Sequence, residues 1–266
     1  MNHATEHFSN WKVNPRKWEI TYVASRLTAL LRALFRRENH VRSDDKLMTP
    51  AVESEYVDLL FNPEFRRSVE QVKDYSCLDV VRLANLWTTA HLVGPGIFVE
   101  VGSYKGGTAL HICNAMENRD SAFYCFDPFE DGGFEKMSEC DAAFKPNDFR
   151  DTQYQAVVRL LSSKPNAKAV QGFFPAAAEG LNLRDIAFAH LDVDIYDSTK
   201  NSLEFLAPRL TPRGLLLVDD VGHRETPGVK IALDEFIASH PLFVAIPMFP
   251  CQALVIPKSF WASDRL

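Results

Sequence analysis

The chain has 266 residues, of which 46% are hydrophobic and 24% charged, a composition typical of a globular protein with a sizeable core. A formal net charge of −6 argues against a nucleic-acid-binding protein, which needs a basic face, and favours a small-molecule partner. The polar N-terminus lacks an apolar signal core, no stretch reaches the roughly 18 apolar residues of a membrane span, and the five cysteines form no CxxC motif. We therefore expect a cytoplasmic protein with reduced thiols.

The N-terminal part is predicted to be a helical extension. Residues 1–15 have the composition of a tail, and apolar residues recur at three- and four-residue steps between Arg16 and Arg37. This stripe predicts a helix that packs on the protein body or on a partner subunit, with a basic helix at a membrane surface as the alternative. We expect residues 1–75 to be a lid or oligomerisation extension and residues 76–266 to be the main domain.

After a helix over about 79–92 and a Gly-Pro-Gly break, short apolar runs alternate with helical segments. The predicted strands cover residues 96–104, 122–129, 167–174, 186–196 and 214–222, and helices are predicted from about 107 and over 150–163, 197–210 and 228–240. This alternation is typical of βαβ units and of a parallel sheet buried on both faces. Two final runs, 242–249 and 252–258, have no helix between them. The predicted fold class is therefore α/β and Rossmann-like, with a five-stranded parallel core and a C-terminal antiparallel hairpin.

The first strand ends in a glycine turn that suits a ligand with a carboxylate. Ligands of open α/β sheets bind at the carboxyl ends of strands, and the helix start after the turn offers free N–H groups. The spacing differs from G-x-G-x-x-G, which disfavours a nicotinamide dehydrogenase. We predict that this turn binds the methionine end of S-adenosylmethionine through Glu100, Gly102, Ser103, Tyr104, Gly107 and Thr108.

An aspartate at the end of the second strand indicates an adenosine-containing cofactor. The carboxylate of Asp127 is placed to accept hydrogen bonds from vicinal ribose hydroxyls. Both S-adenosylmethionine and NAD have such hydroxyls, so Asp127 does not choose between them. Phe129, and Gly172 with Phe173 after the third strand, are predicted neighbours of the adenine.

Aspartates end the fourth and fifth strands. Asp192 follows one, and Asp219 with Asp220 follows the other, so the three carboxylates should meet at one edge of the sheet. Crowded carboxylates repel one another unless they are protonated or bridged by a cation. All-oxygen ligation suits Mg²⁺, with Ca²⁺ or Mn²⁺ as alternatives, and capping of the next helices is the structural alternative. We predict a metal on these three aspartates, with Asp192 or His223 as the general base.

Several segments together resemble the macrocin O-methyltransferase (TylF/MycF/NovP-type) family. They are, in order, VEVGSYKGG, FDPFED, QGFFP, HLDVDIYDSTKNSLEFLAPRLTPRGLLLVDDVG and GVKIALDEF, and the resemblance covers about residues 75–257. It implies a class I methyltransferase fold, S-adenosylmethionine, a divalent metal on Asp192, Asp219 and Asp220, and a sugar hydroxyl in antibiotic biosynthesis as acceptor. His190, Val193 and Val221 stand where the family usually has Arg, Gly and Tyr, which indicates different contacts to the acceptor.

Three alternatives remain beside the glycoside O-methyltransferase. A catechol or phenolic O-methyltransferase shares the Glu-x-Gly-x-Tyr turn, but its catalytic lysine would fall at Ile195. An NAD-dependent oxidoreductase and a non-catalytic cofactor-binding scaffold are more distant. We expect a homo-oligomer, with residues 39–60 and an insertion at 130–149 forming a lid that sets the choice of acceptor.

Overall fold

A computed structural model describes residues 59, 62–116, 120–134 and 136–261. The predicted tail, the amphipathic helix between Arg16 and Arg37, and most of the predicted lid segment 39–60 lie outside these residues. None of the helices within the described ranges combines the length and apolar character that crossing a membrane requires.

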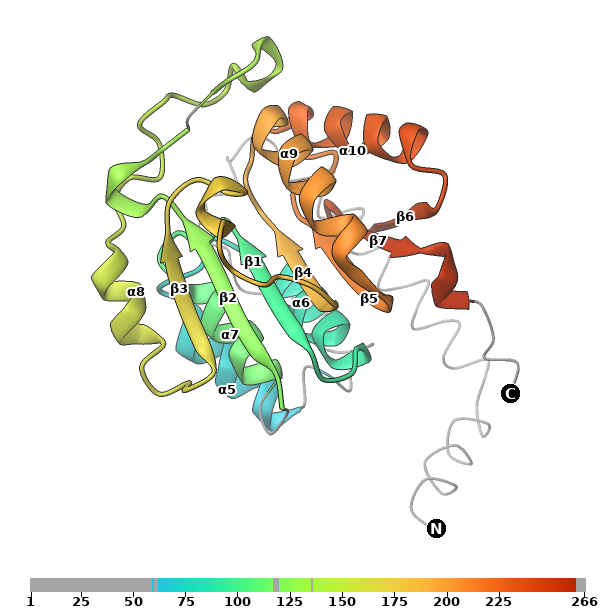
Figure 1. Ribbon diagram of the computed structural model, residues 1–266. Coiled ribbons are helices and arrows are strands. Elements are labelled where there is room, and N and C mark those ends of the chain that lie inside the picture. Colours follow the sequence, from blue (N-terminus) through green and yellow to red (C-terminus); the bar gives the residue numbers. More distant parts are fainter. Residues whose placement is uncertain (1–58, 60–61, 117–119, 135, 262–266) are drawn as a thin grey trace, which may run out of the picture. The chain divides into compact units, whose positions relative to one another are not determined.

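The described strands form one seven-stranded sheet in the order β3-β2-β1-β4-β5-β7-β6 (Figure 1). The strands are β1 (Ile97–Val101), β2 (Ala122–Asp127), β3 (Ala167–Gln171), β4 (Ile186–Leu191), β5 (Leu210–Val218), β6 (Phe243–Met248) and β7 (Gln252–Pro257). The first five are parallel to one another. β7 runs antiparallel to both β5 and β6. The predicted parallel core with a C-terminal antiparallel hairpin is confirmed.

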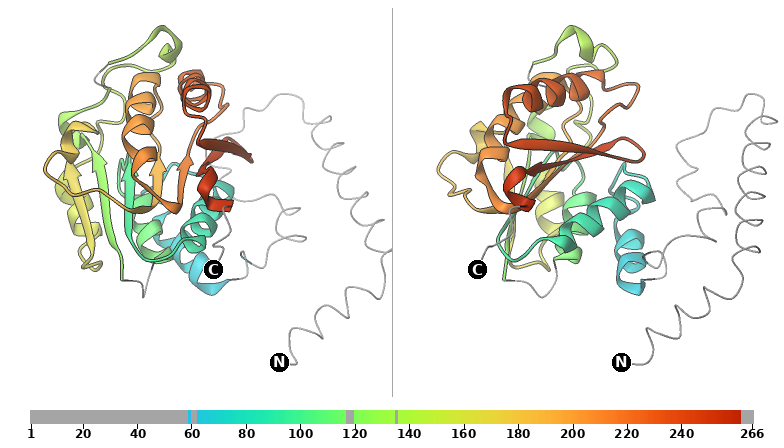
Figure 2. Two further views of the ribbon diagram at one scale, coloured as in Figure 1. Left: turned by 45° about the vertical axis from the view of Figure 1, so that its right-hand side comes forward. Right: turned by 90° about the vertical axis from the view of Figure 1, so that its right-hand side faces the viewer.

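Helices cover both faces of this sheet (Figure 2). They are α5 (Pro63–Val72), α6 (Val80–Leu92), α7 (Gly107–Ala115) and α8 (Tyr154–Leu160) on one face, and α9 (Tyr196–Leu206) and α10 (Pro227–Ser239) on the other. The N-terminus of α6 is set by Asp79, whose carboxylate accepts hydrogen bonds from the N–H groups of Val81 and Arg82. This cap fixes where the first turn of α6 lies, which matters for the site below.

Successive strand side chains point into the two hydrophobic cores in alternation. On β1, Phe98 packs under α5–α8, whereas Val99 and Val101 pack under α9 and α10. Both faces are therefore apolar, as the continuous apolar runs predict. Glu100 and His190 interrupt this apolar pattern, because both are polar side chains that are fully buried on the α6 side of the sheet.

Two features differ from the sequence-based expectation. Helix α9 ends at Leu206, and β5 already begins at Leu210, because Pro208 cannot donate the N–H that would continue the helix. Helix α5 lies within the predicted extension 1–75 but packs on α7, and its Phe65 ring lies 5.7 Å from that of Trp87 on α6. The domain boundary after residue 75 stays a prediction.

Candidate active site

A cavity of about 290 Å³ lies at the carboxyl ends of the parallel strands. It includes the region between β1 and β4, where the strand order reverses and where ligands of such sheets bind. Its volume is close to the lower limit of roughly 300–1,000 Å³ typical of ligand pockets. Most of the predicted site residues line it: Gly102, Ser103, Tyr104, Thr108, Asp127, Gly172, Phe173, Asp192, Asp220 and His223.

Four predicted residues do not line the cavity. Glu100 and Asp219 are buried behind it, and Phe129 is fully buried with its ring 5.6 Å from that of Tyr154. At Gly107, an added Cβ would lie 2.5 Å from the carbonyl carbon of Tyr75, so this glycine allows α7 to approach the preceding chain. Direct ligand contact by these four residues stays a prediction.

The glycine turn is held close to the end of β4. Gly102 has a φ of +89°, and a Cβ there would lie 1.6 Å from the carbonyl oxygen of Asp192. Only glycine fits such a close approach of two backbones. The turn therefore places its backbone N–H groups beside the acidic end of β4.

Asp127 shapes the same turn through its carboxylate. Its Oδ2 accepts hydrogen bonds from the N–H groups of Ser103 at 3.0 Å and Tyr104 at 2.8 Å, and its Oδ1 accepts one from Phe129 at 2.6 Å. Burial raises the pKa of Asp127 to about 6, although these three amides favour the charged form. A ribose bound here would share a carboxylate that already organises the turn.

Acidic side chains gather where β4 and β5 end. Carboxylate oxygens of Asp192, Asp194 and Asp220 lie within 4.8 Å of one another. Asp194 and Asp220 have φ values of 62° and 60°, a backbone conformation that is costly for residues other than glycine and that clusters at functional sites. Burial, together with the neighbouring carboxylates, raises the pKa values of Asp192 and Asp194 well above the usual range. The sequence assigned no role to Asp194, which the structure adds to the cluster.

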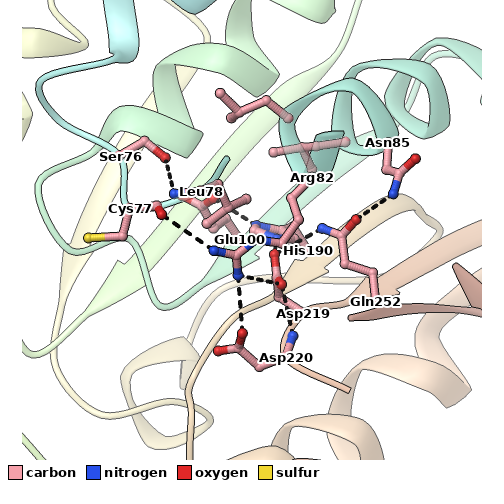
Figure 3. Close-up of polar contacts among 12 residues, drawn as sticks. Ser76, Cys77, Leu78, Arg82, Asn85, Glu100, His190, Asp219, Asp220 and Gln252 are labelled. Carbon is pink, nitrogen blue, oxygen red and sulfur yellow. Dashed lines mark hydrogen bonds and ion pairs between the residues drawn. The ribbon is translucent and has the colours of Figure 1, made fainter. Parts of the chain in front are cut away.

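A buried row of polar side chains runs behind these acids on the α6 side of the sheet (Figure 3). Glu100 on β1 and His190 on β4 are partners in the parallel register, and Oε1 lies 3.0 Å from Nδ1. The Nε2 atom of His190 is 3.5 Å from Oδ2 of Asp219, which also accepts a hydrogen bond from Nε2 of Gln252 at 2.9 Å. Burial alone would lower the pKa of His190, but Asp219 and Glu100 raise it to about 10. The two carboxylates therefore favour the charged form of His190.

Arg82 connects α6 to the same acids. Its Nη1 atom donates to Oδ1 of Asp219 at 3.0 Å and to Oδ1 of Asp220 at 3.1 Å. Burial of Asp219 would raise its pKa, but His190 and Arg82 hold it below its usual value. Sequence reasoning missed Arg82 because its partners are 137 and 138 positions away.

The chemistry of this region fits a divalent cation. The region has more carboxylates than basic side chains. The basic side chains are Arg82 and His190, and the carboxylates belong to Glu100, Asp192, Asp194, Asp219 and Asp220. Those that line the cavity are Asp192, Asp194 and Asp220, and none of these has both oxygens engaged by a cation. An all-oxygen set of this charge suits Mg²⁺ or Ca²⁺.

The predicted insertion 130–149 crosses one side of the cavity. Phe134, Phe144 and Phe149 line it and pack on one another with ring centroids 5.2–6.2 Å apart, and Phe149 also packs on Tyr104. We call these three phenylalanines the aromatic wall. They offer an apolar surface to a ring-shaped part of a ligand.

Comparisons with known proteins agree with this geometry. Residues 99–221 match the family described as "Methyltransferase domain". The tetracenomycin enzyme "8-demethyl-8-(2,3-dimethoxy-alpha-L-rhamnosyl)-tetracenomycin-C 4'-O-methyltransferase" of Streptomyces olivaceus is 26% identical over 47% of this chain and 53% of its own length. Demethyldecarbamoylnovobiocin O-methyltransferase of Streptomyces niveus is 28% identical over 54% of this chain and 59% of its own length.

A solved structure shares the fold. The O-methyltransferase NovP superimposes with a TM-score of 0.61 at 22% sequence identity, over 69% of this chain and 82% of NovP. The chain thus spans little more than half the length of the curated relatives it matches. The resemblance to NovP-type proteins is confirmed as distant homology.

Proposed function

We propose that this chain, which carries a methyltransferase domain over residues 99–221, transfers a methyl group from S-adenosylmethionine to a hydroxyl of a sugar or sugar-like natural product. The observation that carries the proposal is a single cavity lined both by the glycine turn and by the acids Asp192, Asp194 and Asp220. Two distant relatives bear the names of O-methyltransferases of tetracenomycin and novobiocin precursors, which supports a hydroxyl acceptor.

The cofactor would lie along the ends of β1, β2 and β3. Free N–H groups at the start of α7 would face its carboxylate, Asp127 its ribose, and Gly172 with Phe173 its adenine. Bound there, S-adenosylmethionine supplies an electrophilic methyl group on a sulfonium leaving group. The chain then needs to align the acceptor hydroxyl with that methyl group and to remove its proton.

A divalent metal, Mg²⁺ in our proposal, would be held by Asp192 and Asp220 of the predicted ligands together with Asp194, because these three line the cavity. The third predicted ligand, Asp219, is buried behind the cavity and already accepts hydrogen bonds from Arg82 and Gln252. A metal there polarises the acceptor oxygen and lowers the pKa of its hydroxyl. Asp192 lies next to Gly102 at the cavity wall, so we assign it the role of general base. His223, which is exposed and also lines the cavity, is the alternative base.

The absence of a lysine at the position that catechol enzymes use favours a glycoside over a catechol. Ile195, which stands at that position, is apolar, fully buried and not part of the cavity lining. We place the protein in the cytoplasm, in keeping with cysteines that form no disulfide, and propose a homo-oligomer built through the predicted N-terminal helix. A truncated variant that lacks residues 1–38 but keeps the oligomeric state of the full chain in solution would contradict that assembly.

Calorimetric titration tests the cofactor. The purified full chain is titrated with S-adenosylmethionine and with NAD⁺, each with and without MgCl₂. We expect binding of S-adenosylmethionine alone. Binding of NAD⁺ alone would overturn the proposal and favour an oxidoreductase.

The Asp192→Asn variant tests the base. With a glycoside acceptor identified by screening, we expect methyl transfer to fall at least about a hundredfold while S-adenosylmethionine still binds. Asp234→Asn on the exposed face of α10 is the matched control and should keep full activity. Full activity of Asp192→Asn would contradict its role as base and as metal ligand.

A further inference from the structure

We propose that Arg82 is a resident counter-cation of the acid cluster, with which a divalent metal must compete. The inference rests on the proposed function only in assuming that a metal enters this site. It assigns to Asp219 the role of holding the Arg82 guanidinium at the cluster.

The guanidinium of Arg82 is fixed from several sides (Figure 3). Its Nη1 atom bridges Asp219 and Asp220, and its Nε atom donates to Oδ2 of Asp79 at 3.1 Å. Asp79 is also the N-cap of α6, so the start of the helix and the position of the guanidinium are set by one carboxylate. The Arg82 side chain is only 16% exposed. A charge this well held is part of the site and not a mobile surface group.

Asp219 has no oxygen left without a donor. Its Oδ1 accepts from Arg82 and, at 2.8 Å, from the N–H of Asp220, whereas its Oδ2 faces Gln252 and His190. Gln252 is itself held by Asn85 of α6, whose Nδ2 donates to Oε1 at 2.8 Å. A metal that took Asp219 as a ligand would have to break this network.

The open ligands are therefore on the cavity side. Asp192, Asp194 and Asp220 line the cavity, and their oxygens lie within 4.8 Å of one another. A cation bound among them would lie near the guanidinium that contacts Asp220, and the two positive charges would repel each other. Arg82 thus weakens metal binding. It also stabilises the metal-free protein, because its charge is paired with Asp219 and Asp220.

Removing the charge separates these two effects. We expect Arg82→Gln to bind MgCl₂ at least about tenfold more tightly than the wild type in calorimetric titration, and to melt at a lower temperature in EDTA. Arg82→Lys keeps a cation at the position and should bind MgCl₂ within about threefold of the wild type. Arg66→Gln on the exposed face of α5 removes an equal charge elsewhere and should change neither value.

Unchanged or weaker MgCl₂ binding by folded Arg82→Gln would overturn the inference, as would a wild type that binds no MgCl₂. If Arg82→Gln does not fold, Asp194→Asn decides. The inference expects a Kd for MgCl₂ at least about tenfold higher in that variant, and an unchanged Kd would contradict it. If the wild type binds MgCl₂ but not S-adenosylmethionine, the proposed function is contradicted and this inference is not.

Discussion

The Nδ1 atom of His190 lies 3.0 Å from Oε1 of Glu100, directly across the pairing of β4 with β1, and both side chains are fully buried. Because Nε2 of His190 also lies 3.5 Å from Oδ2 of Asp219, one imidazole lies between two buried carboxylates in the interior of the sheet. A buried charge is tolerated only when it is paired. We therefore expect the two buried carboxylates to depend on a charged imidazole at position 190.

The first prediction concerns this cation. His190→Gln leaves Glu100 and Asp219 without it, and we expect the free energy of unfolding to fall by about 3–5 kcal/mol in urea denaturation. Adding Glu100→Gln should recover part of the lost free energy of unfolding, since it removes one of the two buried carboxylates that have lost their partner. A loss below about 1 kcal/mol in the single variant would mean that the pair is not ionised in the folded protein.

The second prediction concerns the close approach of the glycine turn to β4. In Gly102→Ala the new Cβ would lie 1.6 Å from the carbonyl oxygen of Asp192, so we expect loss of S-adenosylmethionine binding in calorimetry and a lower melting temperature. Gly180→Ala is the matched control, because Gly180 has a similar φ of +80° but nothing within 4 Å of an added Cβ. Equal effects of the two substitutions would show that backbone strain, and not the contact with Asp192, explains the loss.

The third prediction concerns pH. The pKa of Asp127 is raised to about 6, so the charged carboxylate that we propose as acceptor for the ribose hydroxyls is lost as pH falls through 6. We expect the affinity for S-adenosylmethionine to fall between pH 7 and pH 5. The effect on stability has the opposite sign: the folded state binds a proton that the unfolded state, with an ordinary Asp pKa, releases, so this group favours folding most at low pH. In Asp127→Asn, affinity should be low and independent of pH over this range.

Sequence reasoning found the residues whose position follows from the strands themselves. Asp127, Asp192 and Asp220 come directly after apolar strand runs, and parallel strands bring such ends to one edge. Arg82 could not be found in this way, because nothing in its helix indicates partners 137 positions away. Phe129 is fully buried and packs on Tyr154, so its predicted place near the adenine still rests on the sequence alone. Tertiary packing, which local pattern does not encode, decides such cases.

The fourth prediction concerns the insertion that carries the aromatic wall. Asp141 attaches the insertion to α9. Its buried carboxylate accepts a hydrogen bond from the N–H of Ser138 within the insertion at 2.8 Å. It accepts another from the N–H of Tyr196 at the start of α9 at 3.0 Å. At its other end, Oε2 of Glu130 accepts a hydrogen bond from the N–H of Tyr154 at 2.6 Å. Of the aromatic wall, Phe134 lies between Glu130 and Asp141 in the sequence, and Phe144 and Phe149 follow Asp141.

Asp141→Ala removes the attachment to α9 and leaves two N–H groups without their acceptor, each a loss of roughly 1–3 kcal/mol. The insertion would then open locally while the sheet stays folded. Hydrogen–deuterium exchange should show amides of residues 136–149 exchanging at least about tenfold faster, with those of β1 and β4 unchanged. Glu139→Ala, an exposed position in the same turn, should leave exchange as in the wild type. Faster exchange spread evenly over the sheet would instead show that Asp141 supports the whole fold and not the insertion alone.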